Sequence, residues 1–204
     1  ERGVEVNVGT IAGNSRATVE ADFFYRQIDD YITVMPDPSL LKRLPLSPNT
    51  VFRYINGTTA NFTGYEVRGR VAASDYLDVQ GFLGYVQATD VLLDEPVFGI
   101  PPFEQRFSVR GHSAGSEHWV ELVVSHANEQ DRVATARLEV PTVGWTTIDL
   151  LAGIRLGEGA ALRIGLENLA DQAYTIHLNA LNPFARSRIF EPGRRAYLGL
   201  EYEF

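Results

Sequence analysis

The chain has 204 residues, a formal net charge of −8 and no cysteine. The lack of cysteine excludes a disulfide framework, a zinc–cysteine site and a thiol nucleophile. The acidic balance argues against a general nucleic-acid binder, which needs clustered Lys and Arg. No stretch approaches the roughly 20 apolar residues that a transmembrane helix requires. No signal peptide is visible and the chain starts within a strand-like pattern, which predicts a piece of a longer protein.

Apolar and polar residues alternate along most of the chain. Side chains two positions apart share one face of a strand. In chain order, the alternating segments are 4–9, 17–26, 65–71, 77–85, 120–125, 148–156, 162–167 and 195–204. A further strand is expected after Ile100-Pro101-Pro102, which gives about nine strands. Segments of about ten residues with one apolar and one polar face are typical of a transmembrane β-barrel.

The connections between these segments alternate in length. The short ones, rich in small turn-forming residues, are 12–15, 73–76, 113–116 and 157–160. The long ones, which contain most of the prolines, are 36–50, 91–102, 128–144 and 168–193. Short periplasmic turns and long extracellular loops are typical of outer-membrane barrels. On pattern alone the alternative is a soluble antiparallel β-sandwich, whose strands also bury one face.

Several short motifs resemble those of the TonB-dependent outer-membrane receptors. Residues 164–174 (IGLENLADQAY) resemble the family's G-(V/L)-x-N-L-x-D-x-x-Y stretch, and residues 191–194 (EPGR) resemble the entry into its last strand. Residues 23–32 (FFYRQIDDYI) resemble an aromatic strand of the family, and Asn56 to Glu66 resemble its N-x-x-x-A-x-x-x-G-x-E pattern. Ile100-Pro101-Pro102 before a strand fits the family as well. Each of these five motifs is weak alone, but in the right order they are strong together and cover essentially the whole chain.

The resemblance implies an all-β fold, an antiparallel transmembrane β-barrel of twenty-two strands whose lumen holds an N-terminal plug domain. Residues 1–204 would be the C-terminal part of that barrel, about nine strands, with the plug domain absent. The implied function is active transport of a scarce nutrient, such as a siderophore or copper chelate, across the outer membrane of a Gram-negative bacterium. The alternatives are a passive porin-like channel and a soluble β-sandwich binding module.

The resemblance also implies the partners. They are outer-membrane lipid, the small-molecule or metal-chelate ligand and the plug domain of the intact receptor. The energy-coupling complex that acts through TonB would be reached only through the missing N-terminal part. No cofactor and no catalytic residue is expected, because no nucleophile-elbow, zinc-protease, P-loop or dinucleotide motif occurs.

Charged residues of both signs mark the polar face of the predicted strands. We expect a solvated lumen wall with cross-strand ion pairs that contacts the plug, or alternatively a path for a charged ligand. The residues are Glu20, Asp22, Glu66, Arg68, Arg70, Asp149, Arg155, Arg163, Glu167, Glu201 and Glu203. Aromatic residues near the segment ends are expected to form interfacial girdles: Tyr25, Tyr31, Tyr65, Tyr85, Trp119, Trp145, Tyr197 and Tyr202.

The candidate ligand contacts lie in two long connections. Asp90, Asp94 and Glu95 follow one predicted strand, and His177 lies in the final connection. These residue types contact metals and metal chelates, but no paired spacing supports a firm metal site. The final connection, from His177 to the EPGR motif, resembles copper-type receptors of the family more than siderophore-type ones.

Three structural roles are predicted near the C-terminus. Residues 168–172 (NLADQ) are expected to end a strand with side-chain-to-backbone hydrogen bonds. In the EPGR motif, Gly193 is expected to permit a positive φ at the entry to the last strand. Tyr202 and Phe204 resemble the assembly signal of outer-membrane barrels.

Overall fold

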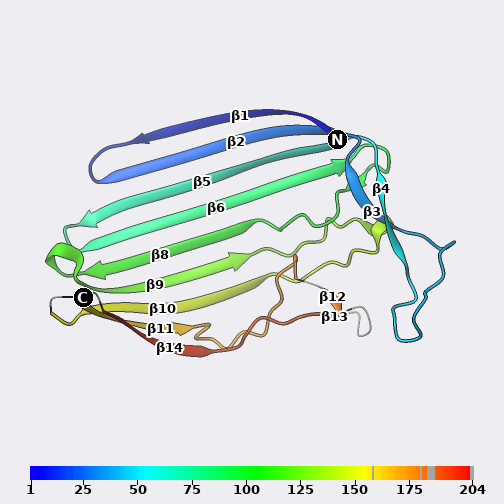
Figure 1. Cartoon of the computed structure of the whole chain (residues 1–204). Coiled ribbons are helices and arrows are strands. Elements are labelled where there is room, and N and C mark those ends of the chain that lie inside the picture. Colours follow the sequence, from blue (N-terminus) through cyan, green and yellow to red (C-terminus); the bar gives the residue numbers. More distant parts are fainter. Residues whose placement is uncertain (158, 180, 183–186, 203–204) are drawn as a thin grey trace.

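The computed structural model describes residues 1–157, 159–179, 181–182 and 187–202. Nine long strands form one antiparallel sheet, in which each strand pairs with the next (Figure 1). In sheet order they are β1 (Arg2–Gly13), β2 (Ala17–Asp29), β5 (Ala60–Ser74), β6 (Leu77–Asp90), β8 (Glu104–His112), β9 (His118–Ala127), β10 (Trp145–Arg155), β11 (Ala160–Glu167) and β14 (Arg195–Tyr202). The all-β antiparallel fold and the strand count are confirmed. The β-sandwich alternative is wrong, because these strands form one sheet rather than two.

Shorter elements belong to the long connections. They are the hairpin of β3 (Ile32–Pro36) and β4 (Phe52–Asn56), β7 (Glu95–Pro96), the pair β12 (Leu181–Asn182) and β13 (Ser187–Arg188), and the 3-10 turns η1 (Ala114–Ser116) and η2 (Thr135–Arg137). Within the described ranges, no helix is long and apolar enough to cross a membrane.

The predicted alternation of short and long connections is confirmed. Between the nine long strands, short turns occupy 14–16, 75–76, 113–117 and 156–159. Long connections occupy 30–59, 91–103, 128–144 and 168–194. All four long connections lie at the same end of the sheet, which we call the long-loop end (Figure 1).

One boundary differs from the prediction. The strand expected to continue through Ile32 stops at Asp29, because Asp30 has a φ of 54° in the left-handed region. A left-handed residue cannot extend a strand. The chain therefore turns away from the sheet at this point and forms the separate β3–β4 hairpin.

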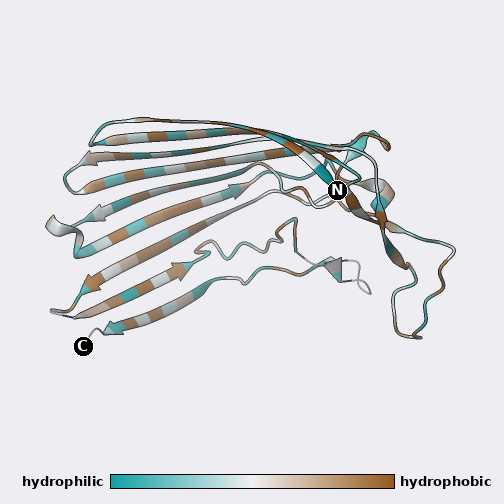
Figure 2. Ribbon diagram, turned by 45° about the horizontal axis from the view of Figure 1, so that its top comes forward, coloured by the Kyte–Doolittle hydropathy of each residue, from teal (hydrophilic) through white to brown (hydrophobic). Residues whose placement is uncertain are grey.

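Hydrophobic and hydrophilic residues alternate along the strands (Figure 2). The strand pairing places the two kinds on opposite faces of the sheet. One apolar row joins Val109, Leu122, Leu150 and Leu166 across four strands. The apolar face is exposed along its whole width, and Leu200 on β14 is 69% exposed. An apolar face of this extent requires a cover, and lipid supplies one to a transmembrane barrel.

The predicted aromatic girdle is only partly correct. On the apolar face, the ring of Tyr65 contacts those of Phe23, Tyr85 and Phe103, with centroids 5.8–6.5 Å apart. Tyr25 lies on the same face, opposite Val6. Trp119 and Tyr197 were wrongly assigned to the girdle, because their rings lie on the polar face.

Two glycines explain where those misplaced rings lie. A Cβ atom at Gly153 would collide with the ring of Trp119, and one at Gly165 would collide with the ring of Tyr197. Each ring therefore lies flat over a glycine of the neighbouring strand. Trp145 and Tyr31 also lie outside the girdle. The ring of Trp145 contacts that of Tyr174, and Tyr31 packs against a small apolar core at the long-loop end.

That small core lies where the long connections begin. Ala60 at the start of β5, Ala88 on β6 and Val97 are each at most 2% exposed, and Tyr31 and Phe62 pack against them. It fixes the roots of two long connections on the sheet.

The assignment of the two faces predicts opposite effects for one substitution at adjacent positions. Leu150 lies on the apolar face at the middle of β10, and Leu151 lies on the polar face opposite Glu121. In lipid vesicles, Leu150→Arg in the protein that carries this chain should lower the free energy of unfolding by about 2–4 kcal/mol. The matched Leu151→Arg should change it by about 0.5 kcal/mol or less. Equal losses for the two variants would contradict the assignment.

Candidate functional site

Buried ionisable side chains gather at the long-loop end, on connections that are far apart in sequence. Asp90 ends β6, Arg137 and Glu139 follow β9, and His177 follows β11. Their exposed fractions are 4%, 2%, 8% and 3%. Charged groups are buried at a large free-energy cost unless partners compensate them. The partners of these four residues therefore define the architecture of the site.

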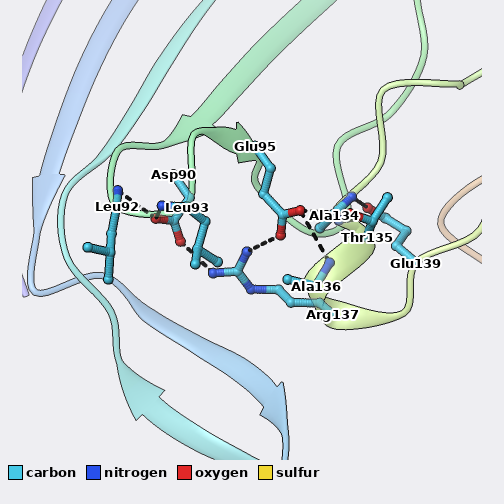
Figure 3. A network of polar contacts seen from close by, with 10 residues as sticks. Asp90, Leu92, Leu93, Glu95, Ala134, Thr135, Ala136, Arg137 and Glu139 are labelled. Carbon is cyan, nitrogen blue, oxygen red and sulfur yellow. Dashed lines mark hydrogen bonds and ion pairs between the residues drawn. The ribbon is translucent and has the colours of Figure 1, made fainter.

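Arg137 lies between two carboxylates of the connection that follows β6 (Figure 3). Its Nη2 donates to Asp90 Oδ2 at 2.5 Å, and its Nη1 donates to Glu95 Oε1 at 3.4 Å. The backbone N–H groups of Leu92 and Leu93 donate to the other oxygen of Asp90, at 3.1 and 3.2 Å. The connection after β6 is thus tied to η2 by charge-assisted hydrogen bonds.

Glu95 completes the attachment to η2. Its Oε2 accepts hydrogen bonds from the hydroxyl of Thr135 at 3.0 Å and from the backbone N–H of Ala136 at 3.2 Å. The first N–H groups of a helical turn have no partner inside the turn. The carboxylate of Glu95 supplies the acceptor for one of them.

Glu139 is held by three donors. Leu138 has a φ of 60° and turns the chain after η2, so that Glu139 Oε2 accepts from the N–H of Ala134 at 2.8 Å. Glu139 Oε1 accepts from the N–H of Gly99 at 2.9 Å and lies 3.1 Å from Nε2 of His177. One carboxylate therefore joins three separate connections.

The charged form of Glu139 is favoured. Burial raises the pKa of this carboxyl, but hydrogen bonds from His177, Ala134 and Gly99 outweigh burial and leave the pKa below its usual value. Hydrogen bonds to the ionised form lower a carboxyl pKa in this way.

His177 uses both ring nitrogens. Nε2 faces the carboxylate of Glu139, and Nδ1 lies 2.9 Å from the hydroxyl of Thr142. An ionised carboxylate only accepts hydrogen bonds, so the proton is assigned to Nε2 of His177. Thr142 is itself fixed by backbone hydrogen bonds with Gln130 in both directions.

The predicted ligand contacts do not form one cluster. Asp90 and Glu95 share Arg137, and His177 pairs with Glu139 instead of with the acidic residues of the other connection. Asp94 is the one of the four that is exposed, at a turn where its φ is 49°. Within the described part of the chain, no group of three or more His, Asp or Glu side chains is arranged to hold a metal ion.

Sequence reasoning missed Arg137 and Glu139, the two residues that organise the site. Both lie in an irregular connection, where no periodic pattern marks a buried position. One signal in the sequence could have indicated Arg137. Residues 90–95 contain three acidic residues and no basic one, so their counter-ion had to come from another connection.

The predicted turn after β11 is confirmed. Asn168 has a φ of 50°, its Oδ1 accepts from the N–H of Gln172 at 2.9 Å, and its Nδ2 donates to the carbonyl of Gln172 at 2.9 Å. The N–H of Asn168 donates to Asp149 Oδ1 at 2.8 Å, which fixes the turn on β10.

The role predicted for Gly193 is wrong. Its φ is not positive, in contrast to Gly99, Gly115, Gly157 and Gly159. A Cβ atom at Gly193 would lie 2.7 Å from Oδ1 of Asp171, the same oxygen that accepts from the N–H of Arg194. Glycine here avoids displacing the Asp171 carboxylate from its hydrogen bond with Arg194, and its dihedral angle is not the reason for it.

Ion pairs connect the strands on the polar face, as predicted. Between strands, Arg70 pairs with Asp78 at 3.1 Å, Arg110 with Glu121 at 2.7 Å and Arg163 with Glu201 at 3.0 Å. Along one strand, Arg68 pairs with Glu66.

A hollow of about 580 Å³ lies over this face and is lined by Glu20, Arg68, Arg70, Arg106 and Glu121 among others. Glu203 lies outside the described residues.

The predicted assembly signal is only partly described. Tyr202 is 68% exposed and ends β14 opposite Ala160, on the apolar face. Phe204 lies outside the described residues. The signal therefore stays a prediction.

Loss of Arg137 should open the long-loop end. In Arg137→Met, the buried carboxylate of Asp90 and the partly buried carboxylate of Glu95 lose their counter-ion, and breaking a buried ion pair costs about 3–5 kcal/mol. The control is Arg16→Met, because the side chains of Arg16 and Asp75 are 70% and 81% exposed and pair at 3.5 Å. An exposed pair contributes at most about 1 kcal/mol. Hydrogen exchange of residues 91–103 should rise strongly in Arg137→Met alone, and equal effects of the two variants would contradict this assignment.

The lowered pKa of Glu139 predicts an acid-sensitive attachment. Its stabilising contribution is present above the usual carboxyl value of 4.5 and is lost as the pH falls below 4.5 through the lower pKa of the folded state. Amide protection at the long-loop end, corrected for the pH dependence of intrinsic exchange, should therefore fall as the pH is lowered below 4.5. In Glu139→Gln this part of the pH dependence should disappear. An unchanged pH profile in that variant would show that another group titrates.

Comparisons with known proteins agree with this architecture. A sequence model of the family described as TonB dependent receptor-like, beta-barrel matches residues 1–169. No curated protein matches the chain in sequence. Among solved structures, the copper transporter OprC superposes with a TM-score of 0.88 at 19% identity, and the match covers 99% of this chain and 31% of that one.

Two further solved structures show the same fold. The FrpB iron transporter of Neisseria meningitidis (F3-3 variant) has a TM-score of 0.73 at 14% identity, covering 99% of this chain and 30% of that one. The siderophore receptor PirA of Acinetobacter baumannii has a TM-score of 0.71 at 16% identity, covering 99% and 32%. The chain thus spans about a third of the length of each protein. With the family match over most of its residues, the chain belongs to the TonB-dependent receptor β-barrel family.

Proposed function

We propose that this chain is the C-terminal part of the barrel of an outer-membrane receptor, which imports a metal chelate or a similar scarce nutrient into a Gram-negative bacterium. The observation that supports this proposal is the superposition of 99% of the chain on the copper transporter OprC and the iron transporter FrpB. In this proposal the long-loop end is extracellular, the apolar face meets lipid and the polar face lines the lumen. The plug domain and the TonB coupling contact would come from the rest of the receptor.

The network of hydrogen bonds and ion pairs at the long-loop end supports a role in ligand capture. Asp90 and His177 are engaged in buried pairs and Glu95 in a partly buried one, so in this state they shape the extracellular face instead of contacting a ligand. Asp94 is exposed at its turn and is the proposed direct contact among the four. Copper is the first cargo to test, because OprC gives a TM-score of 0.88 against 0.73 for FrpB.

A deletion strain tests this proposal. Under metal limitation, loss of the gene should lower the cellular content of copper or of siderophore-supplied iron, measured by mass spectrometry, and a plasmid copy should restore it. Dissipating the proton-motive force should stop this uptake in the complemented strain. Uptake that continues without the proton-motive force would favour the passive porin-like channel. Equal metal content with and without the gene would overturn the proposal.

A further inference from the structure

The hollow over the polar face is lined by five neighbouring strands, from β2 to β9 in sheet order (Figure 1). On the first three of these strands it lies close to the short turns. Thr18, Arg70 and Gln80, which line it, are within five residues of the turns at 14–16 and 75–76. The hollow is therefore on the part of the polar face that is away from the long-loop end.

The floor of the hollow contains an aromatic ring between two arginines. Strand pairing places Phe82 opposite Arg68 on one side and opposite Arg106 on the other. The guanidinium carbon of Arg68 is 5.5 Å from the centroid of the Phe82 ring. A Cβ atom at Gly84 would lie 3.0 Å from Cζ of Phe82, so the ring lies along β6 instead of projecting from it. The ring thus forms a flat apolar surface on a face that is otherwise mostly polar.

The three arginines that line the hollow differ in their partners. Arg68 pairs with Glu66, and Arg70 pairs with Asp78 at 3.1 Å. None of the ion pairs within the described ranges includes Arg106. The guanidinium of Arg106 is exposed, so water solvates it in this chain.

The two carboxylates that line the hollow do not supply the missing partner. Oε2 of Glu121 accepts both hydrogen bonds from Arg110, at 3.0 and 2.7 Å. Glu20 lies on β2, three strands away from Arg106 on β8, which is roughly 14 Å at the usual strand spacing. A segment that covered the hollow would remove water from Arg106. A charge without a counter-ion is buried at a large free-energy cost, so the covering segment must bring an anion.

We propose that the hollow is a docking site for the plug domain of the intact receptor, in which a carboxylate of the plug pairs with Arg106 and an apolar side chain beside it packs on Phe82. A guanidinium can hold a carboxylate with two parallel hydrogen bonds, which fixes the position of the bound segment. This inference rests on the proposed function, which places the polar face in the lumen. The occupant is the plug and not the imported nutrient, because the hollow lies away from the long-loop end and the plug fills the lumen.

Photo-cross-linking in the full receptor identifies the occupant. Gln80 lines the hollow and is exposed, and Gln80→p-benzoylphenylalanine places a photoreactive group there. Mass spectrometry of the irradiated receptor should find a cross-link to a plug peptide that contains Asp or Glu. The matched control is Val79→p-benzoylphenylalanine, one residue away on the apolar face, which should not cross-link to the plug. No plug cross-link from position 80, or an equal one from position 79, would overturn the inference.

An exchange measurement tests the role of Arg106. In Arg106→Gln the cross-linked plug segment should lose a charge-assisted hydrogen bond, so its amide exchange should become on the order of tenfold to a hundredfold faster. Arg106→Lys, which keeps the charge, should restore part of the protection. The control is Arg155→Gln, because Arg155 is exposed on the same face and its side chain donates to the carbonyl of Gly157, outside the hollow.

Two results would overturn the inference and leave the proposed function standing. One is a plug peptide without an acidic residue at the cross-link, and the other is equal exchange in Arg106→Gln and Arg155→Gln. Failure of the proposed function is a separate result, since it would appear as metal uptake that does not depend on the gene.

Discussion

A strand within a bilayer must satisfy its backbone N–H and C=O groups inside the protein, because hydrocarbon offers no hydrogen-bonding partner. The antiparallel pairing that runs from β1 to β14 meets this requirement for every strand between the two edges. The same pairing sets the register, and the register places apolar side chains on one face and charged ones on the other. This register produces both the apolar row through Leu150 and the ion pair of Arg110 with Glu121.

At the long-loop end a different constraint applies. The connections leave the sheet, so their backbone groups and charges must find partners among one another. The connection after β9 supplies most of these partners through Arg137 and Glu139, which act on the connections after β6 and β11. Buried charges with several donors give each connection one preferred position, whereas exposed pairs such as Arg16 and Asp75 contribute little stability.

The sequence predicted the features that depend on local patterns. Period-two alternation predicted eight of the nine strands and their faces, and residues such as Asn168, whose side chain bonds to the nearby backbone, marked the turn after β11. Non-local contacts were not predictable in this way. The partner of Asp90 lies 47 residues away in sequence, and nothing near Arg137 indicates that it is buried.

The errors have the same physical origin. The rings of Trp119 and Tyr197 lie on the polar face, where glycines of the neighbouring strands leave room for them. Gly193 was assigned a dihedral role, but its requirement comes from Asp171 on the other side of the turn. In each case a neighbour distant in sequence decided the outcome.

The sharing of Glu139 among three connections has a consequence for redesign. A carboxylate that accepts from Ala134, Gly99 and His177 ties the composition of each connection to the other two. Grafting a single loop from another receptor would remove one donor or one counter-ion and leave its buried partner uncompensated. The long connections of this chain are therefore a matched set, to be exchanged together in any redesign of the long-loop end.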